Sequence, residues 1–191
     1  GNVAYGGGAY DQVGGQGTLL DCVFTNNFGH TGAGINGVGG VIVSNCILAA
    51  NRASLRGGGA AIWNSVTLQS RFAGCTFMNN SCSGAGYGGA IWAYNVARPT
   101  GVIVNCTFIH NTCTNAGGYA GAIDLETFAI AIQNCAFITN GAITGGGIYC
   151  AQSTSYPTVI SNCTFYGNYS GAGGGIYVKA ANPACPVVQN C

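Results

Sequence analysis

One short pattern repeats seven times along the chain, and this repeat constrains the fold more than any other feature. Each copy has a Gly-rich segment that ends in Ile or Tyr, followed by a Cys that usually stands beside an Asn. A unit of about 28 residues cannot bury its own apolar face, so neighbouring copies must stack on one another. The repeated cysteines are Cys22, Cys46, Cys75, Cys106, Cys135, Cys163 and Cys191.

The residues of each copy are typical of β-strands. Their apolar runs are short, rich in β-branched residues and interrupted by Gly and Asn. Alternation within residues 102–108 predicts one face with Val102, Val104, Cys106 and Phe108, and a second face with Ile103, Asn105 and Thr107. Two or three such strands, joined by tight corners, would form one coil of a parallel β-solenoid with coils ~4.8 Å apart. We therefore expect an all-β fold of about seven coils with ~28 residues per coil.

Stacking of the coils turns each repeated position into a ladder along the solenoid axis. We expect the seven cysteines to form one ladder in the core, in reduced form, as small apolar groups. A second core ladder consists of Phe24, Leu48, Phe77, Phe108, Phe137 and Phe165. A third lies five residues after each Cys and consists of Asn27, Asn51, Asn80, Asn111, Asn140 and Asn168. We expect this Asn ladder at a sharp corner, because Asn tolerates positive φ and stacked amides can hydrogen-bond between coils.

Four cysteines lie outside the core ladder. Cys82 and Cys113 each follow a ladder Cys by seven residues, so they occupy one column on adjacent coils. A Cα separation of ~4.8 Å is within the range that a disulfide spans, and we predict that this pair is bridged. Cys150 and Cys185 lie in neighbouring long corners and are a second candidate pair. Such disulfides would indicate an oxidising compartment, and the low charge also favours an extracellular or cell-surface location.

Composition excludes two classes of protein. The chain has five Lys or Arg and four Asp or Glu, with a net charge of +1, so no basic stripe for nucleic acid exists. No uninterrupted apolar run reaches the ~18 residues of a transmembrane helix. The pattern is already under way at Gly1 and stops at Cys191, without the polar caps of a soluble solenoid. We expect a single β-helix domain over residues 1–191 that is a segment of a longer array or an uncapped fibre subunit.

The sequence predicts no catalytic, metal or cofactor site. Among the acidic residues, Asp124 and Glu126 alone are close, and their i, i+2 spacing places both on one strand face. They could flank a sugar, share a Ca²⁺ ion or form an exposed pair without chemistry. Asp11 occupies the same column but lies four coils away. His30 and His110 fall in different columns and form no metal pair.

A column of aromatic residues follows the inward-pointing Ile of each coil. It contains Trp63, Trp92, Tyr149 and Tyr177, which alternation directs outward. We expect these rings either to be covered in part by the long corner loops, to form a contact between solenoids, or to stack on sugars.

The Gly-Gly-Ala-Ile and Phe-x-x-Asn elements resemble the repeats of chlamydial polymorphic outer-membrane proteins. The match is seen at Gly88-Gly-Ala-Ile91 with Phe108-Ile-His-Asn111, and at Gly146-Gly-Ile-Tyr149 with Phe165-Tyr-Gly-Asn168. The resemblance covers nearly the whole chain. It implies a right-handed parallel β-helix of the pectate-lyase-like superfamily, and it suggests a surface adhesin. Coil two departs from the pattern with Gly32-Ala-Gly-Ile35 and with Leu48 in the Phe column.

These observations favour a non-enzymatic extracellular structural protein whose coils stack end to end into a homopolymeric fibre. The alternative is an adhesin or carbohydrate-binding passenger that contacts glycans or a cell-surface protein through the aromatic column. A polysaccharide lyase or hydrolase is the third hypothesis.

Overall fold

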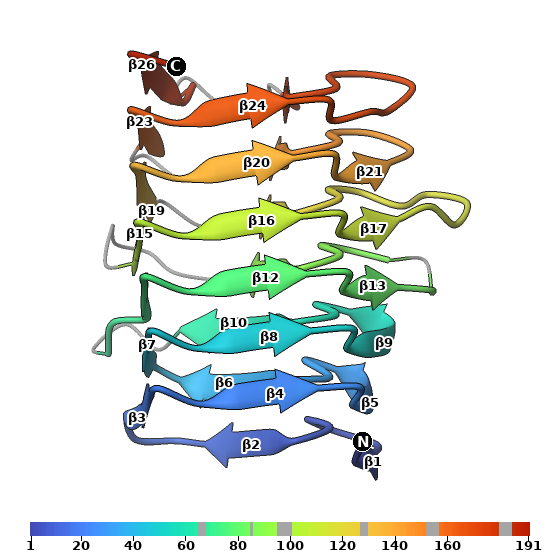
Figure 1. Cartoon of the computed structure of the whole chain (residues 1–191), viewed down its shortest axis with the longest axis vertical. Helices are drawn as coiled ribbons and strands as arrows, with labels where there is room; N and C mark the ends of the chain where they lie inside the picture. The colour runs from blue at the N-terminus through green and yellow to red at the C-terminus, as the bar shows by residue number, and fades with distance from the viewer. Residues whose placement is uncertain (65–67, 85, 95–100, 127–129, 152–156, 180–184) are drawn as a thin grey trace.

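The structure is a computed structural model that describes residues 1–64, 68–84, 86–94, 101–126, 130–151, 157–179 and 185–191. In these residues the chain forms four parallel sheets, A to D, which wind into one solenoid (Figure 1). No helix in this part of the chain is long and apolar enough to cross a membrane.

Each full coil contributes one strand to each sheet in the order A, B, C, D. Sheet A consists of β1 (Val3–Ala4), β5 (Phe28–Thr31), β9 (Arg52–Arg56), β13 (Ser81–Cys82), β17 (Thr112–Cys113) and β21 (Gly141–Ala142). Sheet B consists of β2 (Tyr10–Val13), β6 (Ile35–Gly39), β10 (Ala60–Asn64), β14 (Ile91–Tyr94), β18 (Ile123–Glu126), β22 (Ile148–Ala151) and β25 (Ile176–Val178). Sheet C consists of β3 (Gly17–Leu20), β7 (Val41–Ser44), β11 (Arg71–Ala73), β15 (Gly101–Val104), β19 (Ile130–Gln133), β23 (Val159–Ser161) and β26 (Val187–Gln189). Sheet D consists of β4 (Val23–Thr25), β8 (Ile47–Ala49), β12 (Thr76–Met78), β16 (Thr107–Ile109), β20 (Ala136–Ile138) and β24 (Thr164–Tyr166).

The predicted all-β parallel solenoid is confirmed. Sheets B and C have seven strands and sheets A and D have six, so the chain makes about six full turns. The expectation of two or three strands per coil is wrong, because the segment between sheets D and B also pairs, as the short strands of sheet A. Like residues meet in register, as where Phe77 pairs with Phe108 and Phe108 with Phe137.

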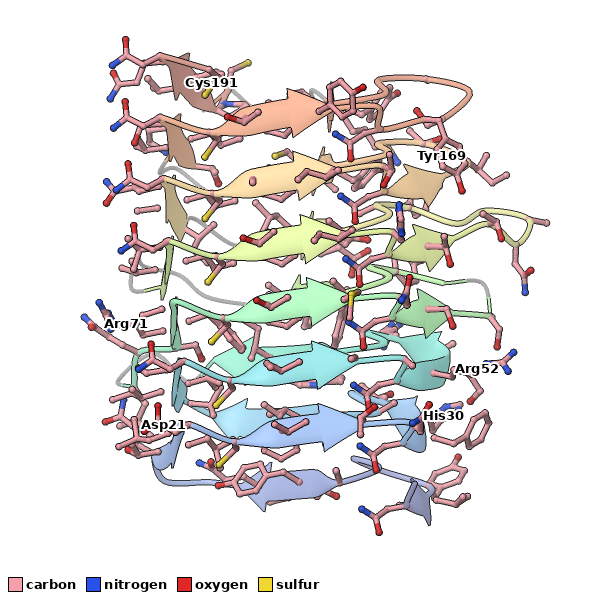
Figure 2. All side chains as sticks on the ribbon, in the orientation of Figure 1. Asp21, His30, Arg52, Arg71, Tyr169 and Cys191 are labelled. Atoms are coloured by element: carbon pink, nitrogen blue, oxygen red, sulfur yellow. The ribbon has the colours of Figure 1, made fainter. Side chains whose placement is uncertain are left out.

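Apolar side chains from sheets B, C and D fill the interior. The rings of Phe77, Phe108 and Phe137 are fully buried, and successive rings of this column stack with centroids 4.8 to 4.9 Å apart from Phe77 to Phe165. The repeated cysteines also stack, one per coil, where sheet C turns into sheet D (Figure 2). Each of these thiols donates to the carbonyl two residues earlier in its own coil, with Sγ to O distances of 3.0 to 3.4 Å. The reduced thiols are therefore satisfied where they lie.

The corner between sheets C and D contains a left-handed residue that reverses the alternation. Asn105 has a φ of 54°, and the residues at this position in the other coils also have positive φ. Ile103, before the corner, points into the core, and so do Cys106 and Phe108 after it. The prediction of a single face through Val102, Val104, Cys106 and Phe108 is wrong for the two valines, because the corner shifts the phase by one residue.

The corner between sheets D and A contains the Asn ladder. The Asn side chains of the middle coils are fully buried, and each Nδ2 donates to Oδ1 of the Asn one coil later at 2.8 to 3.2 Å. Asn2 extends this column by one coil, since its Nδ2 donates to Asn27 Oδ1. Positive φ falls on the residue before each ladder Asn, such as His110 before Asn111. The predicted conformational reason for these Asn residues is therefore wrong, and the amide hydrogen bonds account for them.

Candidate functional site

The outer face of sheet B carries three of the four aromatic residues predicted as a contact column. Trp92, Tyr149 and Tyr177 lie in one column, with Asp124 between Trp92 and Tyr149. Trp92 is 1 % exposed and Tyr149 is 2 % exposed, whereas Tyr177 is half-buried. The expected outward stripe is therefore corrected for Trp92 and Tyr149, which cannot contact a partner directly.

Trp63 occupies the neighbouring outward column of the same face. Ala60, and not Ile62, pairs with Ile91, so Trp63 lies opposite Tyr94. Coil three has two alanines after its glycines, so Trp63 lies two positions beyond the column of Trp92, and its predicted place in that column is wrong. The ring of Trp63 is half-buried.

Side chains from the corner between sheets A and B cover this column. The Arg56 guanidinium lies 4.6 Å from the ring centroid of Trp92 and 5.3 Å from that of Tyr87. The Tyr119 ring lies 4.5 Å from the Tyr149 ring and stacks on Tyr87 at 5.5 Å. Such cation–π and ring contacts stabilise by about 0.5–1.5 kcal/mol each. Sequence reasoning missed these residues, although both tyrosines begin the Gly-containing segment of their coils.

The two predicted neighbouring carboxylates do share this face, in contrasting environments. Glu126 accepts a hydrogen bond from Trp92 Nε1 at 3.0 Å. Asp124 is fully buried, and neither of its oxygens has a hydrogen-bond partner among the described residues. Burial raises the pKa of Asp124 well above its usual value, the charges of Glu126 and Cys82 raise it further, and Arg56 opposes them. The raised pKa favours the uncharged form of Asp124, and its burial keeps solvent-borne molecules away from the carboxyl group.

A groove with a volume of about 370 Å³ opens beside this column at the first three coils. Trp63 lines it, together with Tyr5 and His30, whose rings stack with centroids 5.0 Å apart. Asn36 also lines the groove, and its Oδ1 is buried without a hydrogen-bond partner. Asn36 Nδ2 donates to Asp11 Oδ1 at 2.9 Å. The groove thus combines flat aromatic faces with side chains that offer hydrogen-bond acceptors.

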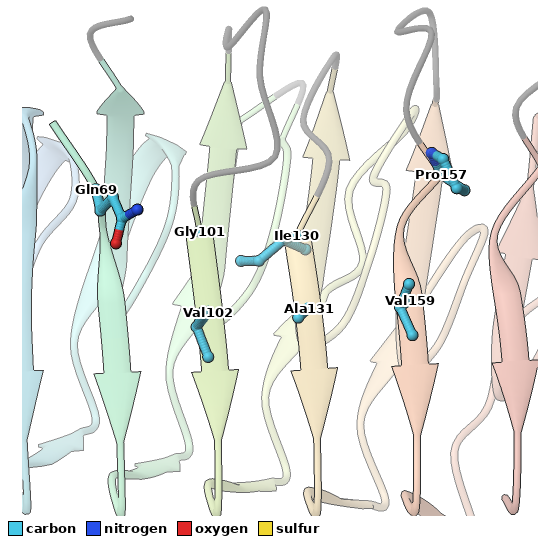
Figure 3. Close-up of a pocket in the computed structure, with 7 residues that line it drawn as sticks. All are labelled: Gln69, Gly101, Val102, Ile130, Ala131, Pro157 and Val159. Carbon is cyan, nitrogen blue, oxygen red and sulfur yellow. The ribbon is translucent and has the colours of Figure 1, made fainter. Parts of the chain in front are cut away.

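A second groove, of about 190 Å³, lies on the outer face of sheet C (Figure 3). Its lining includes Val102, Ile130, Pro157 and Val159, and Gln69 supplies its one polar side chain among the described residues. Among the described residues, this lining contains no titratable side chain.

The four cysteines outside the core ladder occupy three environments, and their thiols are free. Cys82 and Cys113 are buried together in a small cluster under the corner between sheets A and B. Cys150 points into the main core, where burial raises its pKa to about 12, and Cys185 is exposed. Cys150 and Cys185 thus differ in burial, and the Cys82–Cys113 and Cys150–Cys185 disulfides both stay predictions.

Comparison with known proteins bears on the fold. Searches of curated proteins and of solved structures returned no match. The resemblance to chlamydial repeats therefore stays a prediction. The model of one family, described as "Right handed beta helix region", matches residues 2–191. With that match and the parallel coils described above, the chain belongs to the right-handed β-helix family.

Proposed function

We propose that this chain is a non-enzymatic structural module of an extracellular or cell-surface repeat protein, and that further coils extend its stack into a filament. The observation that carries this proposal is the regular register of the stack. Like residues pair from coil to coil, as Phe77 does with Phe108 and Phe108 with Phe137, and the inward position of Ile160 pairs with that of Val188. A further coil with the same pattern would continue every one of these columns.

Matching coils add to such a stack for two reasons. Unpaired strand edges template the addition of further strands. Each added coil also buries apolar side chains, at about 25 cal/mol per Å² of surface removed from water. The added coil can belong to the same polypeptide or to another copy. Self-association into a homopolymer is the second case.

Electron microscopy of the purified chain at increasing concentration tests self-association. Filaments with a uniform cross-section are expected for the wild type. Val188→Asp would place a charge in the contact between coils and should abolish filaments. Val104→Asp, on the outward face of β15, is the matched control and should leave them intact. A dispersed monomer at every concentration contradicts end-to-end association.

A second candidate function is carbohydrate binding at the groove of Trp63, Tyr5 and His30. Aromatic faces stack on the apolar faces of sugar rings, and the acceptors of Asn36 and Asp11 suit hydroxyl donors.

A glycan array compares three variants in this test. Trp63→Ala should remove binding, whereas Tyr166→Ala, an exposed ring on β24, should not. Trp92→Ala should lower stability, because its ring is buried. Equal binding by wild type and Trp63→Ala rejects the groove as the sugar site.

A further inference from the structure

Two cysteines outside the core ladder meet across adjacent coils. β13 and β17 are neighbours in sheet A, and Ser81 pairs with Thr112, so the following residues Cys82 and Cys113 lie side by side. Both are buried in a small cluster whose other members are alanines, namely Ala33, Ala53 and Ala142. This cluster is separate from the main core that contains the Cys ladder.

Gly86 shows how closely the two sulfurs converge. A Cβ atom at Gly86 would lie 2.7 Å from Cys82 Sγ and 2.9 Å from Cys113 Sγ. Both sulfurs therefore face one point beneath the backbone of this corner, and a side chain there would displace them.

The hydrogen bond of the Cys82 thiol is shorter than those of the ladder thiols. The Cys75 thiol of the ladder contacts the Ala73 carbonyl of its own corner at 3.4 Å and the Val43 carbonyl of the preceding coil at 3.5 Å. The Cys82 thiol donates to the Leu55 carbonyl of the preceding coil at 2.7 Å. Cys82 is thus held closely by the coil before it.

The two thiols are also unequal. The hydrogen bond with Cys113 lowers the pKa of Cys82, and the backbone amides of Gly84 and Tyr87 and the charge of Arg56 lower it further against the effect of burial. Its hydrogen bond to Cys82, together with burial, raises the pKa of Cys113. Cys82 is 4 % exposed whereas Cys113 is fully buried, so Cys82 is the thiol that an incoming reagent meets first.

We propose that Cys82 and Cys113 form an exchange-active dithiol that small disulfides oxidise. Cys82 loses its proton and attacks one sulfur of a disulfide RSSR, which forms a mixed disulfide at Cys82 and releases one thiolate RS⁻. Cys113 then loses its proton and attacks Cys82 Sγ, which forms the Cys82–Cys113 bond and releases the second RS⁻. The protein gives up two electrons and two protons, and RSSR becomes two RSH. The product is a covalent bond between two consecutive coils.

The experiment exposes the folded, reduced protein to 2-hydroxyethyl disulfide, followed by alkylation and peptide mapping. We expect Cys82 and Cys113 to be joined with the loss of two hydrogen atoms. The buried ladder residues Cys75 and Cys106 should stay alkylatable after denaturation. Exposed Cys185 should react with the disulfide and so shows that the reagent is active. Free Cys82 and Cys113 in a sample whose Cys185 is fully converted overturn the proposal.

Single variants test the order of attack. Cys113→Ala should retain the mixed disulfide at Cys82, because the resolving thiol is missing. Cys82→Ala should form far less adduct at Cys113. Gly86→Ala should displace both sulfurs and slow ring closure, whereas Ser83→Ala, a neighbouring exposed position, should not. Equal adducts at the two cysteines of the single variants would overturn the assigned roles.

Discussion

At the scale of single residues, asparagine has two separate uses in this chain. Asn105 and its equivalents take positive φ at an exposed corner, where Asn is favoured for its backbone conformation. Asn111 and its equivalents lie buried at the next corner and are used for their side-chain amides. Substitutions in the two columns should therefore have different costs.

Asn111→Ala should lower the free energy of unfolding by about 3 kcal/mol or more. It removes the acceptor for the backbone N–H and Nδ2 of Asn80 and the donor to the Phe77 carbonyl, and each buried polar group left unpaired costs about 1–3 kcal/mol. Asn105→Ala should cost only about 1–2 kcal/mol, for an L-residue in the left-handed region. Denaturant unfolding of both variants measures these costs. Equal losses of unfolding free energy would contradict different roles for the two Asn columns.

Asp124 makes stability depend on pH with a known sign. Its pKa in the folded state is raised, so above the unfolded value of about 3.9 the unfolded chain releases a proton that the folded chain keeps. Stability should therefore fall as pH rises, until the folded pKa is passed. Asp124→Asn should remove this slope of about 1.4 kcal/mol per pH unit and should stabilise the protein at pH 7. Unfolding between pH 4 and pH 9 measures it.

Glu126→Gln is the matched control for that titration. A Gln at this position still offers an oxygen to Trp92 Nε1, and Asp124 keeps its burial. The downward slope of stability with pH should persist in this variant. A wild type whose stability is flat or rising over the same range would contradict an uncharged Asp124.

At the scale of elements, the sequence predicts which residues stack but not which way each strand faces. The Phe column is visible because its spacing follows the Cys spacing, and the structure stacks these rings. The predicted inward face of Val102 and outward face of Ile103 are wrong. The left-handed corner at Asn105 shifts the alternation by one residue, and alternation of residue types alone does not reveal such a shift. The predicted position of Trp63 in the column of Trp92 is wrong for a different reason. Ala60 and Ile62 are both apolar, so the sequence does not show which of them pairs with the inward Ile of the next coil.

The candidate site is less predictable than the fold. Sequence places Asp124 and Glu126 on one face, since that depends on two residues of one strand. It does not show that Arg56 and Tyr119 cover the column, because these residues reach it from corners whose geometry depends on the stacking of whole coils. Burial of Trp92 follows from this cover and not from its own strand.

The ring stack should tolerate a change of shape better than a loss of volume. Phe108→Ala should cost about 3–5 kcal/mol, because Phe108 is fully buried between Phe77 and Phe137. Phe108→Leu should cost less, since Leu48 already occupies this column without exposure. Thermal or denaturant unfolding ranks the two variants, and a larger loss for Leu than for Ala would contradict a continuous ring column.

At the scale of the whole molecule, the coils behave as interchangeable layers. Thr112 pairs with Gly141 one coil later, so deletion of residues 112–140 would join Asn111 to Gly141 with every column in register. We expect the shortened chain to keep its β circular dichroism and to unfold at lower denaturant, because one layer of contacts is lost. Deletion of residues 112–126 is the control. It would remove the sheet A and sheet B strands of one coil and leave the sheet C and sheet D strands, so the coils would no longer match. Folding of both deletions alike would contradict a register-dependent stack.

The Asn ladder also gives the solenoid a net side-chain dipole along its axis. Every amide from Asn2 to Asn140 donates toward the later coil, so the side-chain dipoles add in one sense, as peptide dipoles do in a helix. Within the column, each Oδ1 accepts from the Asn of the earlier coil, and each Nδ2 donates to the Asn of the later coil. Two identical ends brought together by a two-fold axis would set donor against donor or acceptor against acceptor. Only head-to-tail contact continues the column, and such contact does not close on itself.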